Sequence, residues 1–119
     1  MVLGAEMSDT DRELLQAAAK AAGKTKARYV EVWNAMADPA EDGDGFDYLT
    51  YWNPLTSGND TFRLMVDLGI GVMIDMQTKT ATAYAPGNQN GFVESFSDDD
   101  YNHGAKRAVT RAAAWLGGV

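Results

Sequence analysis

The chain has 119 residues, of which 45% are hydrophobic and 23% charged, proportions typical of one globular domain rather than a disordered chain. It contains no cysteine, which excludes disulfides, thiolate catalysis and cysteine-based zinc sites. The formal net charge of −7 repels nucleic-acid phosphates, so we expect no direct DNA or RNA binding.

The N-terminal end of the chain differs from the rest. Residues 1–7 lack the basic start and the apolar run of a signal peptide, and a second methionine, Met7, directly precedes a helix-start pattern. We therefore expect residues 1–7 to be an extension and residues 8–119 to form a single domain. No stretch approaches the roughly 20 apolar residues of a membrane-spanning helix, so we expect a cytoplasmic protein without a membrane partner.

The first predicted element is a helix. Thr10 and Glu13 match a capping box, in which each side chain binds the backbone amide of the other residue. Gly23 is a natural stop for this helix. The many alanines between them indicate close approach to whatever the helix covers.

Two strands are predicted next. Residues 28–34 alternate in the manner of a strand, and residues 37–45 are loop-like in their Pro, Gly and Asp content. Residues 46–52 again have strand composition and end at Asn53-Pro54. Because both faces of this second strand carry apolar groups, we expect both faces to be covered.

A second helix and a hairpin follow. Asn59 or Asp60 is the expected N-cap of the helix, and Gly69 is its expected stop. Residues 70–76 alternate cleanly as a strand, and a turn leads into a second strand at residues 80–85.

The C-terminal part predicts a short edge strand at residues 92–96 and a last helix from Tyr101 to Leu116, with acids before it that favour a helix start. The predicted fold class is α+β: a mainly antiparallel sheet of about four strands with three helices packed on its faces, in the order α-β-β-α-β-β-α.

Acidic side chains gather in two of the connecting segments. One lies between residues 38 and 47, and the other directly precedes the last helix. The candidate partner-binding residues are Glu41, Asp42, Asp44, Asp98, Asp99 and Asp100. Concentrated acid on loops would steer the protein to a basic partner, including a surface that normally holds nucleic acid. The alternative is that the first loop is only solvated and the second group only starts a helix.

The first acidic segment has the look of a calcium loop. An EF-hand would need an acid where Ala40 stands and a bidentate glutamate where Leu49 stands. We therefore predict no metal or other cofactor, with an irregular weak cation site as the open alternative.

No catalytic residues are predicted. His103 is the only histidine, and an acid–base role beside Asp99 or Asp100 is the weaker alternative to a plain helix-end position. Gly23-Lys24-Thr25 resembles the end of a phosphate-binding loop but closes a helix instead of opening one. Trp33, Trp52 and Trp115 are expected to anchor the core, unless an exposed one marks an interaction surface.

Three stretches resemble a known family. They are residues 14–23 (LLQAAAKAAG), a middle stretch made of residues 52–55 (WNPL), Asp60 and residues 63–70 (RLMVDLGI), and residues 105–114 (AKRAVTRAAA). Together they resemble the phage α-β-α sandwich domain, found in small proteins of tailed phages and prophages. The resemblance implies a viral source, hence the host cytoplasm, and a layered α/β fold. It implies no activity.

Two functions follow as hypotheses. The first is a non-enzymatic phage accessory protein that binds a host or phage protein, in the manner of a counter-defence inhibitor. The second is a small-ligand or nucleotide-derivative binder, or a small enzyme, with a pocket at Trp52, Asn53 and His103. Exposed aromatics beside clustered acid would favour the first, and a concave pocket that gathers those three residues would favour the second.

Overall fold

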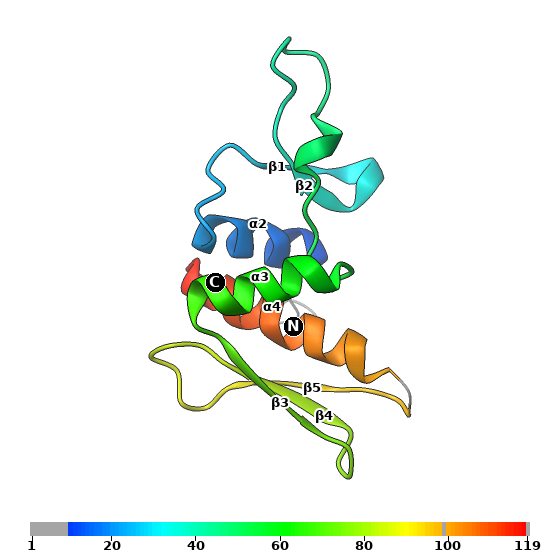
Figure 1. Cartoon of the computed structure of the whole chain (residues 1–119), viewed down its shortest axis with the longest axis vertical. Coiled ribbons are helices and arrows are strands. Elements are labelled where there is room, and N and C mark those ends of the chain that lie inside the picture. Colours follow the sequence, from blue (N-terminus) through cyan, green and yellow to red (C-terminus); the bar gives the residue numbers. More distant parts are fainter. Residues whose placement is uncertain (1–9, 99, 119) are drawn as a thin grey trace, which may run out of the picture.

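The structure is a computed structural model that describes residues 10–98 and 100–118. These ranges contain three α-helices and two antiparallel sheets, which confirms the α+β class (Figure 1). The elements are α2 (Asp11–Ala21), β1 (Arg28–Val30), η1 (Glu31–Trp33), β2 (Ala35–Ala37), η2 (Tyr48–Thr50), α3 (Gly58–Leu68), β3 (Gly71–Asp75), β4 (Thr80–Tyr84), β5 (Phe92–Ser95) and α4 (Tyr101–Leu116), where η marks a 3-10 helix. The proposed extension, residues 1–7, lies outside the described residues and stays a prediction. None of the described helices has the length and apolar character needed to cross a bilayer.

Helix α4 lies at the centre of the fold. The three-stranded sheet covers one side of it, and α2 and α3 lie on the other (Figure 1). Its buried positions are mostly small, with no exposed surface at Ala108, Ala112 and Ala113. A Cβ atom on Gly117, just after α4, would stand 2.0 Å from the carbonyl oxygen of Ala17 on α2. Small side chains therefore allow the two helices to approach closely, as the alanine content predicts.

The ends of α2 are formed as predicted. The backbone amide of Glu13 donates to Oγ1 of Thr10, and that of Thr10 donates to Oε1 of Glu13, each at 3.1 Å. Gly23 has a φ of +78° and follows the last turn of the helix. The capping box is confirmed, and the glycine supplies the left-handed residue that ends a helix.

The sheet of β3, β4 and β5 confirms the predicted hairpin and edge strand. Met73 lies opposite Thr82, and Thr82 lies opposite Val93, so these three residues share the outer face. The neighbouring positions of β4, Ala81 and Ala83, face the core and have no exposed surface. Along β3 and β5, alternation thus separates a face packed on α4 from an outer face that is exposed at Met73 and Val93, whereas Thr82 on the central strand is covered.

The first two predicted strands differ from the structure. The strand expected over residues 28–34 ends at Val30, because the chain turns through η1 and reverses at Asn34, which has left-handed geometry (φ 48°, ψ 50°). The chain then returns as β2 and pairs with β1, so the pairing is divided between two small sheets instead of one. Asparagine tolerates this conformation, and its Oδ1 accepts a hydrogen bond from the Tyr29 hydroxyl at 2.5 Å.

The strand expected over residues 46–52 is wrong for most of its length. The Asp47 carboxylate accepts from the amide of Leu49 and caps η2, which replaces the extended chain. Only the two ends keep strand pairing among the described residues: Phe46 bridges Pro39, and Trp52 makes hydrogen bonds of 2.9 and 2.8 Å with the backbone of Met36. A local side-chain cap therefore prevails over strand composition.

The N-cap expected at Asn59 or Asp60 is also wrong. Ser57 occupies that position, and its Oγ accepts from the amide of Asp60 at 3.2 Å. The carboxylate of Asp60 instead accepts from the amide of Asn53 at 2.9 Å. The predicted stop at Gly69 is confirmed, with a φ of +70°.

Candidate functional site

Four aromatic rings gather at the end of the molecule that carries η1 and η2. Trp33 is at the centre of this group: its ring centroid lies 6.3 Å from Phe46, 5.7 Å from Tyr48 and 6.2 Å from Tyr51. The contacts with Phe46 and Tyr48 are edge-to-face. Aromatic pairs at these separations attract one another, so the rings hold a defined arrangement even at the surface.

The cluster is open to solvent, contrary to the expectation that both faces of residues 46–52 are covered. Tyr48 is 70% exposed and its neighbour Leu49 is 92% exposed, whereas Trp33 is half-buried beneath them. We define the tip surface as Val32, Trp33, Phe46, Tyr48, Leu49 and Tyr51. Clustered apolar exposure of this kind marks interaction sites on soluble proteins.

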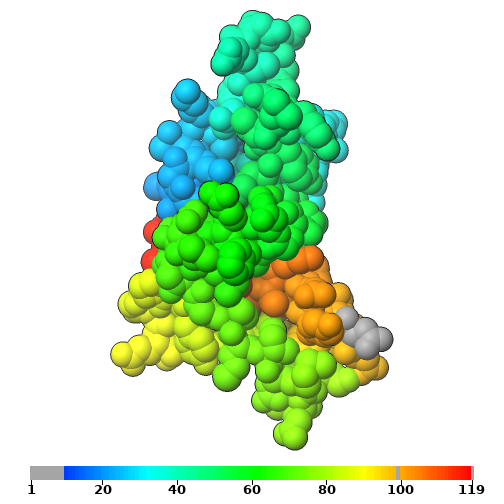
Figure 2. Space-filling view, viewed as in Figure 1, coloured from blue at the N-terminus to red at the C-terminus, as the bar shows by residue number. Residues whose placement is uncertain are grey.

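An ordered arm stands beside the tip surface. Residues 38–47 double back on themselves, with the amide of Asp47 bonded to the carbonyl of Asp38 at 2.9 Å and that of Ala40 bonded to Gly45 at 3.0 Å. The Asp42 carboxylate accepts from the amide of Asp44 at 2.9 Å and tightens the end of the arm. Figures 1 and 2 show this acidic arm projecting from the upper end of the molecule.

The acidic arm carries negative charge that the described chain does not neutralise. Glu41, Asp42 and Asp44 are all exposed, and residues 38–47 include no basic residue. None of the ion pairs among the described residues involves the arm. The side chains of Glu41 and Asp44 make no hydrogen bond within residues 10–98 and 100–118, so their carboxylates are open to a partner.

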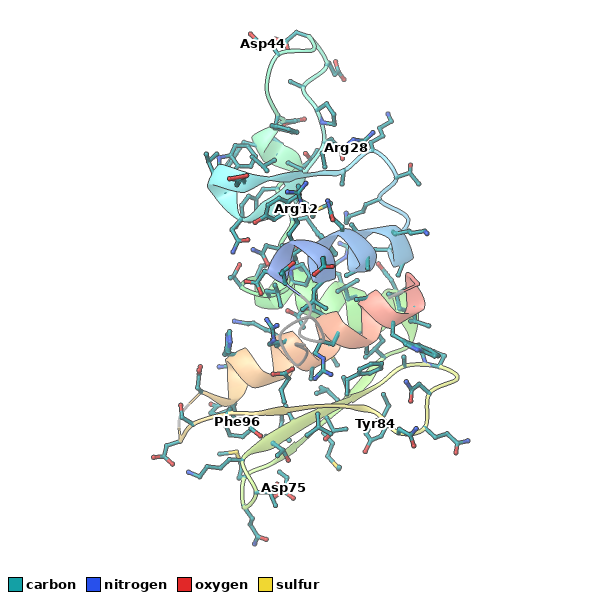
Figure 3. The ribbon with its side chains drawn as sticks, turned by 180° about the vertical axis from the view of Figure 1, so that it is seen from behind. Arg12, Arg28, Asp44, Asp75, Tyr84 and Phe96 are labelled. Carbon is teal, nitrogen blue, oxygen red and sulfur yellow. The ribbon has the colours of Figure 1, made fainter. Side chains whose placement is uncertain are left out.

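The second acidic segment lies elsewhere. Asp98 pairs with Lys79, and Asp100 stands at the N-cap of α4 without a side-chain capping bond. Asp99 lies outside the described residues. Figure 3 places Asp44 and Phe96, which lies two residues before Asp98, at opposite ends of the molecule. The structure therefore does not bring the two predicted acidic groups together. The first adjoins the aromatic cluster around Trp33, and the second is followed by a single exposed ring, Tyr101.

A buried asparagine joins the tip to the rest of the molecule. Asn53 is 2% exposed, and its Nδ2 donates to the carbonyl of Asn34 at 2.7 Å while its Oδ1 accepts from the amide of Leu55 at 2.9 Å. Its own amide is bonded to Asp60 on α3. Asn53 thus holds the turn of the β1–β2 hairpin against the start of α3, a structural role.

A groove of about 660 Å³ lies below the tip, between the segment after α2, η2 and α3. Trp52 lines it while remaining buried, with the Lys24 ammonium 5.4 Å from its ring centroid. The charged lining residues are Lys24, Lys26, Arg63, Asp38, Asp60 and Asp67. These opposite charges balance, so the groove does not select a ligand by net charge.

The groove gathers one of the three residues proposed for a ligand pocket. Trp52 lines it, whereas Asn53 and His103 are not among the lining residues. His103 lies exposed on the first turn of α4, and its side chain makes no hydrogen bond or ion pair with any residue that the structure describes. In the same part of the chain, no group of three His, Cys, Asp or Glu side chains is placed to hold a metal ion.

The pKa of Asp75 lies below its ordinary value because the carboxylate accepts hydrogen bonds from the backbone amides of Thr78 and Gln77. This exposed residue stands in the β3–β4 turn, near the end of the molecule away from Asp44 (Figure 3). The lowered pKa therefore reflects a turn and not a reactive site.

The aromatic part of the site is missed by the sequence prediction. Phe46, Tyr48 and Tyr51 have the composition of a strand covered on both faces, whereas in the structure they belong to a short segment that no part of residues 10–98 and 100–118 covers. No local sequence signal marks these rings as exposed, since Trp52 of the same segment is buried.

Comparisons of the chain with protein-family models, with curated proteins and with solved structures give no match.

Proposed function

We propose that this protein is a non-enzymatic binding protein that docks its tip surface and acidic arm onto a basic surface of a partner protein. The observation that carries the proposal is the exposed aromatic cluster around Trp33 together with the adjoining acidic arm, whose carboxylates form no ion pair with the residues that the structure describes. Exposed aromatic rings together with clustered acidic side chains favour the hypothesis of a protein-binding surface over that of a small-ligand pocket.

The two parts of the site would act at different stages of binding. Tyr, Trp and Phe are enriched in the buried centres of protein interfaces, where a few such side chains supply most of the binding energy. Charged groups around such a centre mainly raise the association rate. Because the rings of Trp33, Tyr48 and Tyr51 already contact one another, little side-chain freedom remains to be lost on docking.

The chemistry of the arm defines the kind of partner. Glu41 and Asp44 present carboxylates on a projecting segment, which suits a surface rich in lysine and arginine. A protein surface that normally holds nucleic acid has this character. The resemblance to a phage family adds the more specific proposal that the partner is a host or phage protein and that binding inhibits a host defence.

The experiment is a capture of partners on the immobilised protein, followed by association kinetics with the purified partner at several salt concentrations. Glu41→Gln combined with Asp44→Asn should slow association at low salt and flatten its salt dependence. The control removes the same number of charges elsewhere, with Asp67→Asn and Asp100→Asn. If both variants slow association equally, only the net charge of the protein matters. If the arm variant associates at the wild-type rate, the acidic arm has no role in binding.

The groove supports a second candidate function, the binding of a small ligand such as a nucleotide derivative. Its volume of about 660 Å³ lies within the usual range of ligand pockets, roughly 300–1,000 Å³. Adding nucleotides should then raise the melting temperature of the wild type but not of Arg63→Gln. No shift with the wild type, or an equal shift with Arg63→Gln, would count against this candidate.

A further inference from the structure

The two edges of the three-stranded sheet are protected unequally. On β5, the Arg111 guanidinium donates to the carbonyl of Val93 at 3.0 Å and pairs with Glu94 at 2.7 Å, so a charged side chain occupies a main-chain acceptor of that strand. On β3, β4 pairs with one side, and no described strand pairs with the other. Natural proteins guard such edges with charges, prolines or bulges, because an open edge can pair with another chain.

The first four residues of β3, Gly71 to Ile74, carry none of those guards. Its five residues run in regular register with β4, without proline, and its only charge is Asp75 at the end of the strand. The residues before Asp75, from Ile70 to Ile74, carry no charge at all. The chain has a net charge of −7, but this uncharged segment adds little electrostatic repulsion when a second copy approaches it.

The edge also leaves apolar surface on both faces of the sheet. Val72 and Ile74 point toward α4 but remain only half-buried, although the facing β4 positions are fully covered. On the outer face, Met73 is 57% exposed. An added strand would cover side chains on both faces and bond the open main-chain groups at the same time.

We propose that two copies of this chain pair through β3, antiparallel and about a twofold axis beside Met73, to form a continuous six-stranded sheet. In this register Val72 of one copy lies opposite Ile74 of the other, which extends the apolar inner face. Asp75 lies opposite Gly71, so the two acidic side chains do not face each other. The pairing is isologous, as expected for a closed dimer, and it leaves the tip surface free.

The test is the molar mass measured by sedimentation velocity over a range of protein concentrations. The mass of the wild type should rise twofold, from one copy to two. Met73→Lys should keep the mass of a single copy, whereas Val93→Lys should pair like the wild type. These two substitutions are matched, because Met73 and Val93 lie on the same outer face, on opposite edges, with 57% and 52% of their surfaces exposed.

A second measurement, hydrogen exchange of the wild type, does not depend on whether Met73→Lys folds. In the wild type, amide protection of residues 71–75 should increase with protein concentration, while that of residues 92–95 should stay constant. A single-copy mass at every concentration would overturn the proposal. Equal loss of pairing in Met73→Lys and Val93→Lys, or concentration-dependent protection at β5 alone, would also overturn it.

Discussion

The body of the molecule and its tip place their apolar side chains in opposite ways. In the body, formed by α2, α4 and the three-stranded sheet, the covered residues are largely alanines, packed so closely that Gly117 has no room for a Cβ atom. At the tip, the larger rings of Tyr48 and its neighbours stand at the surface, in contact with one another. Burial that stabilises the fold and apolar surface available for binding are thus held in different parts of the chain.

Because of this separation, chemically identical substitutions should change the free energy of unfolding by different amounts in the two regions. A leucine of the body contributes to the free energy of unfolding through burial and packing, whereas a leucine of the tip surface contributes little to it. The predictions below follow this contrast.

The largest effect is expected for Leu15→Ala, because Leu15 has no exposed surface. Removing it should lower the free energy of unfolding by about 2–5 kcal/mol. Leu49→Ala makes the same chemical change at a residue that is 92% exposed and should alter stability by no more than about 0.5 kcal/mol. Urea unfolding of both variants measures the two changes in the free energy of unfolding. Similar losses of stability in the two variants would contradict the distinction between body and tip.

Asn53→Ala should have the next largest effect, because it removes the side chain that joins the tip to α3. Its loss leaves the carbonyl of Asn34 and the amide of Leu55 without their bonds, at a cost of about 1–3 kcal/mol. Hydrogen exchange should show protection falling more at residues 34–37 than in α4. Asn59→Ala is the control, since Asn59 is exposed, and an equal loss of stability there would contradict this role.

Thr10→Ala should lower the free energy of unfolding by about 1 kcal/mol, because it removes half of the capping box of α2. Thr10→Ser keeps the hydroxyl group and should restore most of the stability. Thermal unfolding distinguishes the two variants, and a Thr10→Ser protein as unstable as Thr10→Ala would show that the cap is not the cause.

The smallest effect concerns Asp75 and pH. Since its pKa is lowered in the folded protein, the carboxylate stabilises the turn at neutral pH, and this contribution fades as the pH falls below the ordinary value of 3.8 through the folded pKa. Asp75→Asn removes the titration. The stability difference between wild type and variant should therefore be constant near neutrality and change only in acid; a pH-independent difference would contradict the assignment.

Features set by neighbouring residues were predictable from the sequence. The capping pair Thr10 and Glu13, the stop at Gly69 and the β3–β4 hairpin depend on residues a few positions apart, and all are confirmed. The exposed positions of Glu41 and Asp44 also agree with a solvated loop, although the loop proved to be ordered.

The tip was not predictable in the same way. Its shape depends on the left-handed geometry of Asn34 and on the bond from Asn53 to that residue, 19 positions away in the chain. Composition favours a strand through Tyr48 and Tyr51, but η2 forms because the Asp47 carboxylate caps it. Whether an aromatic residue is covered depends on the whole chain, so exposure of this cluster became visible only in three dimensions.

The central claim is that the tip surface binds a partner without holding the fold together, and the double variant Tyr48→Ser, Leu49→Ser tests it most directly. Its melting temperature and its retention of the partner captured by the wild type are measured side by side. Phe62→Ser with Val66→Ser is the matched control, because these residues expose similar apolar surface on α3, away from the aromatic cluster. We predict that the tip variant keeps the melting temperature of the wild type and loses the partner, while the control variant retains it. A tip variant that still binds with unchanged affinity, or a control variant that loses the partner equally, would contradict the account.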